Sequence, residues 1–200
     1  MKKLIFAAII AVVSLSIAHA QSIQSVKFGA KAGVNFANLV GDDVEDASMR
    51  TSFHVGGVVD LMISDKFSFQ PELLYSSQGA RYKYDENGFD VEQTLKLDYL
   101  NLPLMGKFHV TEEFSLHVGP QIGFLLAANA KIESEGITVE DDVKDFIKDI
   151  DFGVNLGAGY KLPSGLFFDA RYNIGLSNLP DEGDDKVRNS VIQVSVGYLF

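Results

Sequence analysis

Two histidines stand near serine and acidic residues at spacings that invite a test for nucleophilic catalysis. Ser115 and His117 are two residues apart, which puts both side chains on one face if the segment is a β-strand. His54 has Asp60 and Glu72 as candidate acidic partners. A Ser–His–acid set needs an accessible rim, and no motif typical of a lipase or protease surrounds these residues. We therefore expect them to pack and hydrogen-bond in an interior, and we predict no catalytic residues.

Three acidic tracts could supply hard oxygen ligands to a cation. They are residues 42–46, 85–88 and 181–185. None has the spacing of a 12-residue calcium loop. The sequence therefore predicts solvated, mutually repelling loops, with no metal and no cofactor.

Composition excludes several classes of protein. Of 200 residues, 46% are hydrophobic, which is too many for a disordered chain. The absence of cysteine excludes disulfides and thiolate metal sites. With 17 Lys and Arg against 27 Asp and Glu, the formal charge is −10, so nucleic acid is not an expected partner.

The first twenty residues have the pattern of a secretory signal peptide. Lys2-Lys3 precedes an apolar run over residues 4–18, and residues 18–20 supply a small-x-small cleavage pattern. As a helix this run would rise about 22 Å, short of the roughly 30 Å hydrocarbon core of a bilayer. We therefore expect a signal peptide over residues 1–20 and a single mature domain over residues 21–200.

The mature chain alternates apolar and polar residues with a period of two, as β-strands do. Eight segments show this pattern: residues 26–36, 53–63, 67–76, 95–108, 114–124, 150–160, 168–176 and 192–200. In the fourth segment the apolar residues change phase near Tyr99. One extra residue would reconcile the two halves, so we predict a β-bulge there.

The connections between these segments alternate short and long, as in up-and-down barrels of outer membranes. The long ones are residues 40–50, 80–94, 129–149 and 178–188. Together they hold 19 acidic and 8 basic residues, so nearly all of the net charge lies at one end. In the third, Val143, Phe146, Ile147 and Ile150 have helical spacing and predict a helical turn or two as a lid over the mouth.

Alternation alone does not say which face points inward, because a lipocalin-like barrel and an outer-membrane barrel are opposites in this respect. The apolar rows carry no charged residue, the polar rows are rich in Gly, Ser, Asn and Gln, and aromatics gather beside the short turns. These features favour the membrane form. We predict an all-β, eight-stranded antiparallel up-and-down transmembrane β-barrel in the outer membrane.

A barrel of eight strands has a lumen that side chains can fill, so no open pore is expected. The charges assigned to the inner rows nearly balance: Lys27, Lys31, Lys96 and Arg171 against Asp60, Glu72, Asp98, Asp151 and Asp169. We single out one interior polar cluster: Lys31, Asp60, Glu72, Asp169 and Arg171. Ion pairing among these residues would form the core of the barrel.

Residues 29–36, 69–76 and 98–104, with their "QPELLYS" and "YLNLPL" segments, resemble the PorT-type outer-membrane β-barrel family of Gram-negative bacteria, a porin-like outer membrane protein beta-barrel domain. Residues 194–200, with Tyr198 and Phe200, resemble the C-terminal assembly signal of such barrels. The resemblance implies periplasmic chaperones and a barrel-assembly machine as partners during biogenesis. It also implies contact with outer-membrane lipid and lipopolysaccharide. The acidic tracts leave one alternative open, a weak bridging to the phosphates of lipopolysaccharide through divalent cations.

The expected role is non-enzymatic: a structural, adhesion or secretion-accessory protein of the outer membrane. The main alternative is a narrow channel or small-ligand binder that uses Lys31, Glu72, Asp169 and Arg171. A soluble secreted lipocalin-like binder and a barrel hydrolase remain as lesser alternatives. Oligomeric state is left open.

Overall fold

The computed structural model describes residues 23–200 apart from 43, 45–46, 87–88, 135–136 and 182–185, so the predicted signal peptide lies outside the described residues. The elements are β1 (Ser25–Gly41), β2 (Ala47–Ser64), β3 (Phe67–Glu86), β4 (Phe89–His109), β5 (Phe114–Ser134), β6 (Ile137–Asp142), the 3-10 turn η2 (Lys144–Phe146), β7 (Ile150–Lys161), β8 (Leu166–Gly175) and β9 (Val187–Leu199). Across the described ranges, no helix has the length and apolarity needed to cross a membrane.

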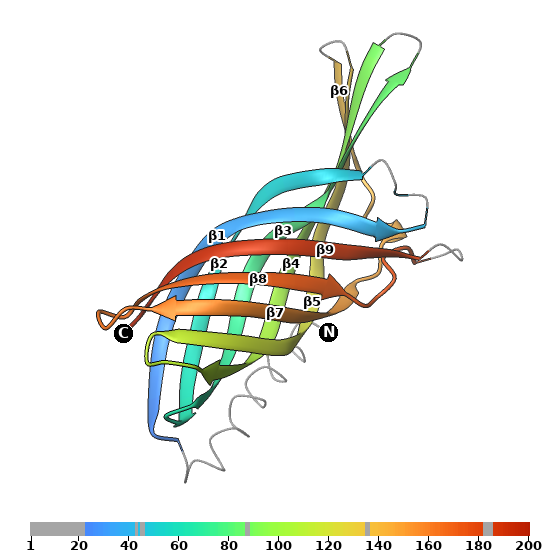
Figure 1. Cartoon of the computed structure of the whole chain (residues 1–200). Coiled ribbons are helices and arrows are strands. Elements are labelled where there is room, and N and C mark those ends of the chain that lie inside the picture. The colour runs from blue at the N-terminus through green and yellow to red at the C-terminus, as the bar shows by residue number, and fades with distance from the viewer. Residues whose placement is uncertain (1–22, 43, 45–46, 87–88, 135–136, 182–185) are drawn as a thin grey trace.

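Eight of the strands close into an antiparallel ring in the order β1-β2-β3-β4-β5-β7-β8-β9, and β9 pairs back with β1 (Figure 1). This confirms the predicted all-β up-and-down barrel. Closure leaves no free sheet edge in the ring, because each strand has a neighbour on both sides. Strand β6 stands outside the ring and pairs with the last part of β5, from Asn129 to Ser134.

The two ends of the barrel differ in their connections. At one end, which we call the turn end, short turns join β2 to β3, β4 to β5 and β7 to β8. Strand β1 begins and β9 ends there, since the Phe200 amide donates to the Phe28 carbonyl. The opposite end, which carries the longer connections, is the loop end.

The inner face of the barrel is polar and the outer face is apolar. Lys31, Glu72 and Arg171 are 2%, 2% and 4% exposed. Phe53 and Val194, on the outer face, are 53% and 50% exposed. Lipid around the barrel explains this arrangement, whereas a lipocalin-like barrel would have its apolar rows inside.

Past the barrel, β3, β4 and β5 continue at the loop end and join β6 in a four-stranded sheet, the projecting sheet (residues 80–86, 89–97, 127–134 and 137–142; Figure 1). One rung, Tyr82–Gln93–Ile132–Val139, crosses all four strands. The prediction that residues 80–94 and 129–149 are loops is therefore wrong for most of their length. These segments are highly charged, which is typical of loops. Their charged and apolar residues nevertheless alternate, as they do in paired strands that have one face in water.

The predicted bulge near Tyr99 is present, but its extra residue lies in β5. Leu126 is inserted between the pairs Asp98↔Ala127 and Tyr99↔Leu125, while β4 pairs with β3 without interruption through this region. Leu97 and Tyr99 stay on the inner face, where both are fully buried. The phase change thus marks a switch in which face is apolar, and β4 itself contains no added residue.

The predicted helical lid is reduced to the single turn η2, because the residues before it form β6. Val143 and Ile147 flank the turn and pack against an apolar cluster at the loop end. Phe146 instead is 74% exposed, and Ile150 already begins β7.

Candidate functional site

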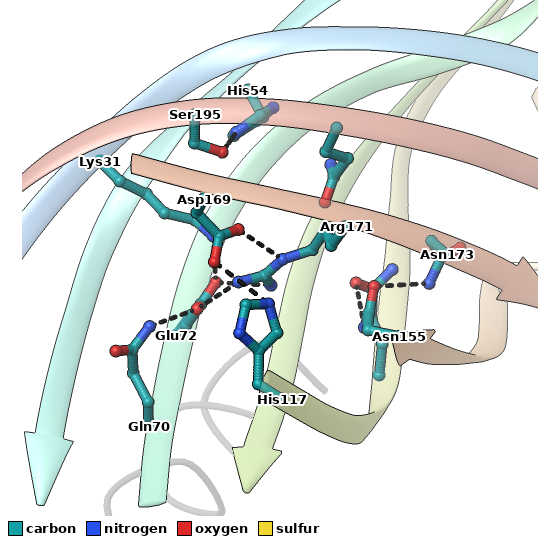
Figure 2. A network of polar contacts seen from close by, with 12 residues as sticks. Lys31, His54, Gln70, Glu72, His117, Asn155, Asp169, Arg171, Asn173 and Ser195 are labelled. Carbon is teal, nitrogen blue, oxygen red and sulfur yellow. Dashed lines mark hydrogen bonds and ion pairs between the residues drawn. The ribbon is translucent and has the colours of Figure 1, made fainter. Parts of the chain in front are cut away.

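The centre of the lumen holds a network of ion pairs built on Arg171 of β8 (Figure 2). Its guanidinium donates to both carboxylate oxygens of Glu72, at 2.9 and 3.1 Å, and its Nε donates to Asp169 Oδ1 at 2.9 Å. Lys31 Nζ lies 2.8 Å from Glu72 Oε2 and 3.6 Å from Asp169 Oδ1. A planar guanidinium matches a carboxylate in this two-bonded geometry, which holds the network in one arrangement.

This network spans the full width of the barrel. Glu72 is on β3 and Arg171 is on β8, and four steps around the eight-membered ring separate these strands in either direction. Lys31 on β1 adds a third strand. The ion pairs therefore tie opposite walls together, and the side chains that form them occupy the lumen at this level.

Four residues of the predicted interior cluster meet in this network: Lys31, Glu72, Asp169 and Arg171. Asp60 is buried, at 3% exposure, but no salt bridge within 4 Å joins it to another described residue. Its place is nearer the turn end, where it lines a small cavity together with Lys107.

Sequence reasoning missed three members of the network. His117 Nε2 lies 3.1 Å from Asp169 Oδ2, Gln70 donates to Glu72 Oε1 at 2.8 Å, and Lys107 Nζ donates to Gln70 Oε1 at 3.0 Å. The alternation along β4 is the sequence signal for Lys107. It falls on the same row as Asn101, opposite the apolar row, and Asn101 is buried in the lumen. The predicted inward position of Lys96 and Asp98 is wrong: both lie on the outer face, where Lys96 pairs with Glu140 at 2.9 Å.

A second, uncharged layer lies next to the ion pairs. His54 hydrogen-bonds Asn35 Oδ1 and Ser195 Oγ, both at 2.7 Å, and Gln193 also donates to Asn35 at 2.9 Å. Across the lumen, Asn173 donates to Asn155, which donates to Gln121. These amides fill the interior and are linked to one another by hydrogen bonds.

Apolar side chains close the lumen on both sides of the polar layers. At the loop end the apolar seal consists of Leu39, Ala80, Leu97, Tyr99, Leu125, Ala128 and Leu179. Toward the turn end, Val58, Phe167 and Leu199 form a smaller cluster. A hollow of about 570 Å³ at the turn end, lined in part by Lys27, His109 and Lys161, adjoins only about 10 Å³ of space beside Asp60.

The candidate catalytic residues Ser115 and His117 take part in packing. Ser115 and His117 are each 4% exposed inside the barrel, and the hydrogen bonds of the described residues do not join them to each other. His117 faces the Asp169 carboxylate instead. Among the described side chains, no three His, Asp or Glu residues are grouped to hold a metal ion.

The projecting sheet has two unlike faces. Its charged face is crossed by ion pairs: Arg81–Glu92 at 3.0 Å, Lys83–Glu92 at 3.1 Å, Lys96–Glu140 at 2.9 Å and Lys131–Glu133 at 2.7 Å. The hydrogen bond from Lys131 lowers the pKa of the Glu133 carboxyl. Its apolar face continues the inner wall of the barrel and carries Tyr82, Tyr84, Val91, Leu95, Ala130, Ile132 and Val139.

Comparison with known proteins places these features in a wider group. The family described as outer membrane protein beta-barrel domain matches residues 19–181. The attachment invasion locus protein Ail of Yersinia pestis has a TM-score of 0.53 at 15% identity, and a second Ail structure, with the heparin analogue sucrose octasulfate, has 0.51 at 14%. Neisserial surface protein A has 0.50 at 16%. Each match covers 88% of this chain and 100% of the other.

At such low identity these likenesses show the barrel fold alone. No curated protein matches the chain in sequence.

Proposed function

The chain belongs to the outer membrane protein beta-barrel domain family, and from this we propose that its barrel is a plugged membrane anchor that presents the projecting sheet outside the cell for docking. The observation that carries the proposal is the change of polarity along β3, β4 and β5. Within the barrel their outer face is apolar, as lipid requires, and in the projecting sheet the same face is charged and ion-paired. A charged face of this kind belongs in water.

The lumen supports an anchor better than a channel. The ion pairs between β3 and β8 occupy its centre, and the apolar seal covers the loop end. A solute that crossed would have to displace both. We propose a non-enzymatic role for the same reason, since His54 and His117 are buried within these layers, away from either rim.

Single-cysteine labelling tests the orientation, because the chain has no cysteine of its own. Thr138→Cys, on exposed β6, should react with a membrane-impermeant maleimide on intact cells. Asp65→Cys, in a turn-end connection, should react only after the outer membrane is permeabilised. The reverse pattern would contradict the proposal.

Planar-bilayer recording tests the plug. The purified protein should give no steady conductance, whereas the narrow-channel alternative requires one that changes in Arg171→Ala. A stable conductance with that sensitivity would replace docking by transport as the function.

Finer assignments rest on sequence resemblance. We propose PorT-type membership from the segments at residues 69–76 and 98–104, and export through residues 1–20. We also propose insertion by the barrel-assembly machine through the end of β9. Tyr198 and Phe200 support this, since both are outward and exposed, at 46% and 74%. Deleting Phe200 should lower the amount of heat-modifiable, folded protein in outer-membrane fractions.

Two further proposals concern the partners of the protein. In the membrane, the partners of the barrel would be outer-membrane lipid and lipopolysaccharide. A sulfated ligand such as the one bound to Ail is a poor partner here, because the four long connections carry a net charge of −11.

A further inference from the structure

The apolar face of the projecting sheet is open over part of its area in the described residues, although Val91 on it is buried. Tyr84, Ile132 and Val139 are 44%, 40% and 50% exposed on it. A sheet that stands in water usually packs its apolar face on another layer. Tyr82 and Leu95, at the base of this face, pack against the apolar seal, so the packed core of the barrel holds the base of the sheet in place.

The basic residues of the sheet are already occupied. Arg81 and Lys83 contact Glu92, Lys131 contacts Glu133, and Lys96 contacts Glu140, all on the charged face. Acidic residues still outnumber basic ones in the four strand segments of the sheet, by eight to four. On β6, which pairs only with β5 in the described residues, Asp141 is exposed on the apolar face, and Glu140 and Asp142 are exposed on the charged face of the same edge strand.

Three kinds of occupant can be compared. A second copy of this chain would bring an equally acidic loop end against the first, so charge repulsion opposes face-to-face pairing. Lipid is not the expected occupant of the apolar face. The apolar face continues the inner wall of the barrel, and it is the charged face that continues the lipid-facing wall. A polypeptide with a row of apolar side chains and a row of Lys or Arg would satisfy both the open face and the acidic surplus.

We propose that the apolar face of the projecting sheet docks a cationic amphipathic polypeptide. The proposal rests on the proposed function, since the sheet must stand outside the membrane to meet such a partner. The apolar side chains of the partner would cover Tyr84, Ile132 and Val139, and its cations would lie against Asp141 on the same face and along the acidic edge of β6. Exclusion of water from the apolar row would supply affinity, and the charges would speed association and select the partner.

A defined probe tests this without knowledge of the natural partner. The full-length protein, folded in phosphatidylcholine nanodiscs, is titrated with a peptide that alternates Leu and Lys, and protein-free nanodiscs provide the background. Two matched peptides replace Lys by Glu or Leu by Ser. The Leu/Lys peptide should bind saturably, more weakly at high salt, and each matched peptide should bind about tenfold more weakly or worse.

Variants then locate the binding. Ile132→Ser with Val139→Ser should weaken Leu/Lys binding about tenfold, because it removes two exposed members of the apolar face. The control is Lys131→Ser with Thr138→Ser, one residue away on the opposite face, which should keep the affinity or raise it slightly. Asp141→Asn should reduce the salt dependence. Heat-modifiable mobility on gels establishes that each variant is folded.

Four outcomes would overturn the proposal: binding no stronger than to protein-free discs, equal binding of the Lys and Glu peptides, unchanged binding by the Ile132→Ser and Val139→Ser variant, or self-association through this face. If cysteine labelling still places β6 outside the cell and planar-bilayer recording shows no steady conductance, such a result rejects only the proposed nature of the partner. If β6 is not outside, the proposed function itself fails.

Discussion

Strands β3, β4 and β5 build two regions with opposite polarity. In the barrel their outer face carries apolar residues such as Leu73 and Leu116, and their inner face carries Glu72. In the projecting sheet the outer face carries Lys83 and Glu92, and the inner row is apolar. Period-two alternation persists through both regions, so it assigns residues to faces, while the surroundings decide which face is apolar.

The boundary between the regions is one rung wide. The outward rung Tyr75–Leu100–Phe124–Ile150 is apolar, and the next outward rung, Ser77–Asp98–Ala127, is polar or small. Ion pairs differ across the same boundary: those of the lumen have essentially no exposed side-chain surface, and those of the sheet are partly exposed. The two regions should therefore respond very differently to equivalent substitutions.

The largest effect is expected in the lumen. Arg171→Ala leaves Glu72 and Asp169 without their guanidinium and should cost about 3–5 kcal/mol of unfolding free energy. Arg171→Lys keeps the charge but loses the two-bonded geometry, and should fall between Ala and wild type. Urea unfolding of the refolded barrel, followed by tyrosine fluorescence, measures both. A cost below about 1 kcal/mol for Ala would erase the contrast with the sheet.

A smaller effect should follow from a charge on the lipid-facing wall. Val194→Arg, half-exposed on the middle of β9, should cost about 2–4 kcal/mol because an arginine would enter hydrocarbon. Val139→Arg, equally exposed on the projecting sheet, should change stability by only about 0.5 kcal/mol. Unfolding in lipid vesicles gives both values, and equal costs would place the two regions in the same surroundings.

The smallest effect should come from the charged face of the sheet. Lys83→Ala removes one partly exposed contact to Glu92 and should cost about 0–1 kcal/mol, with less effect at high salt. The same unfolding assay at two ionic strengths tests it. A salt-independent loss of several kcal/mol would mean that this pair is as shielded as those of the lumen.

Sequence alone was sufficient for the barrel because lipid imposes a strict rule on the outer rows. No charge can be tolerated there, so Val194 and Phe168 identify their own face and place Asp169 and Arg171 on the other. Water imposes no such rule on the projecting sheet. The prediction of loops is therefore wrong for its strands. The predicted inward position of Lys96 and Asp98 is wrong as well, because the apolar row changes face at the boundary between the two regions.

The membership of the central network was predictable only in part. Parity gives the inner row, but the level of each residue depends on the stagger between strands, which alternation does not reveal. Lys31 and Glu72 meet at 2.8 Å, whereas Asp60, on the same kind of row, lies nearer the turn end. His117 belongs to the network because the stagger of β5 places it at the height of Asp169 along the barrel axis.

The tie between Glu72 and Arg171 has a consequence for the order of folding. The two residues are 99 positions apart, and their strands belong to opposite walls. A partly assembled barrel that contains β3 without β8 would hold a carboxylate in its lumen with no guanidinium to meet it. The unpaired carboxylate raises the free energy of intermediates with fewer strands. Closure of the barrel is therefore an all-or-none step, and the ion pair contributes its stabilisation only late in folding.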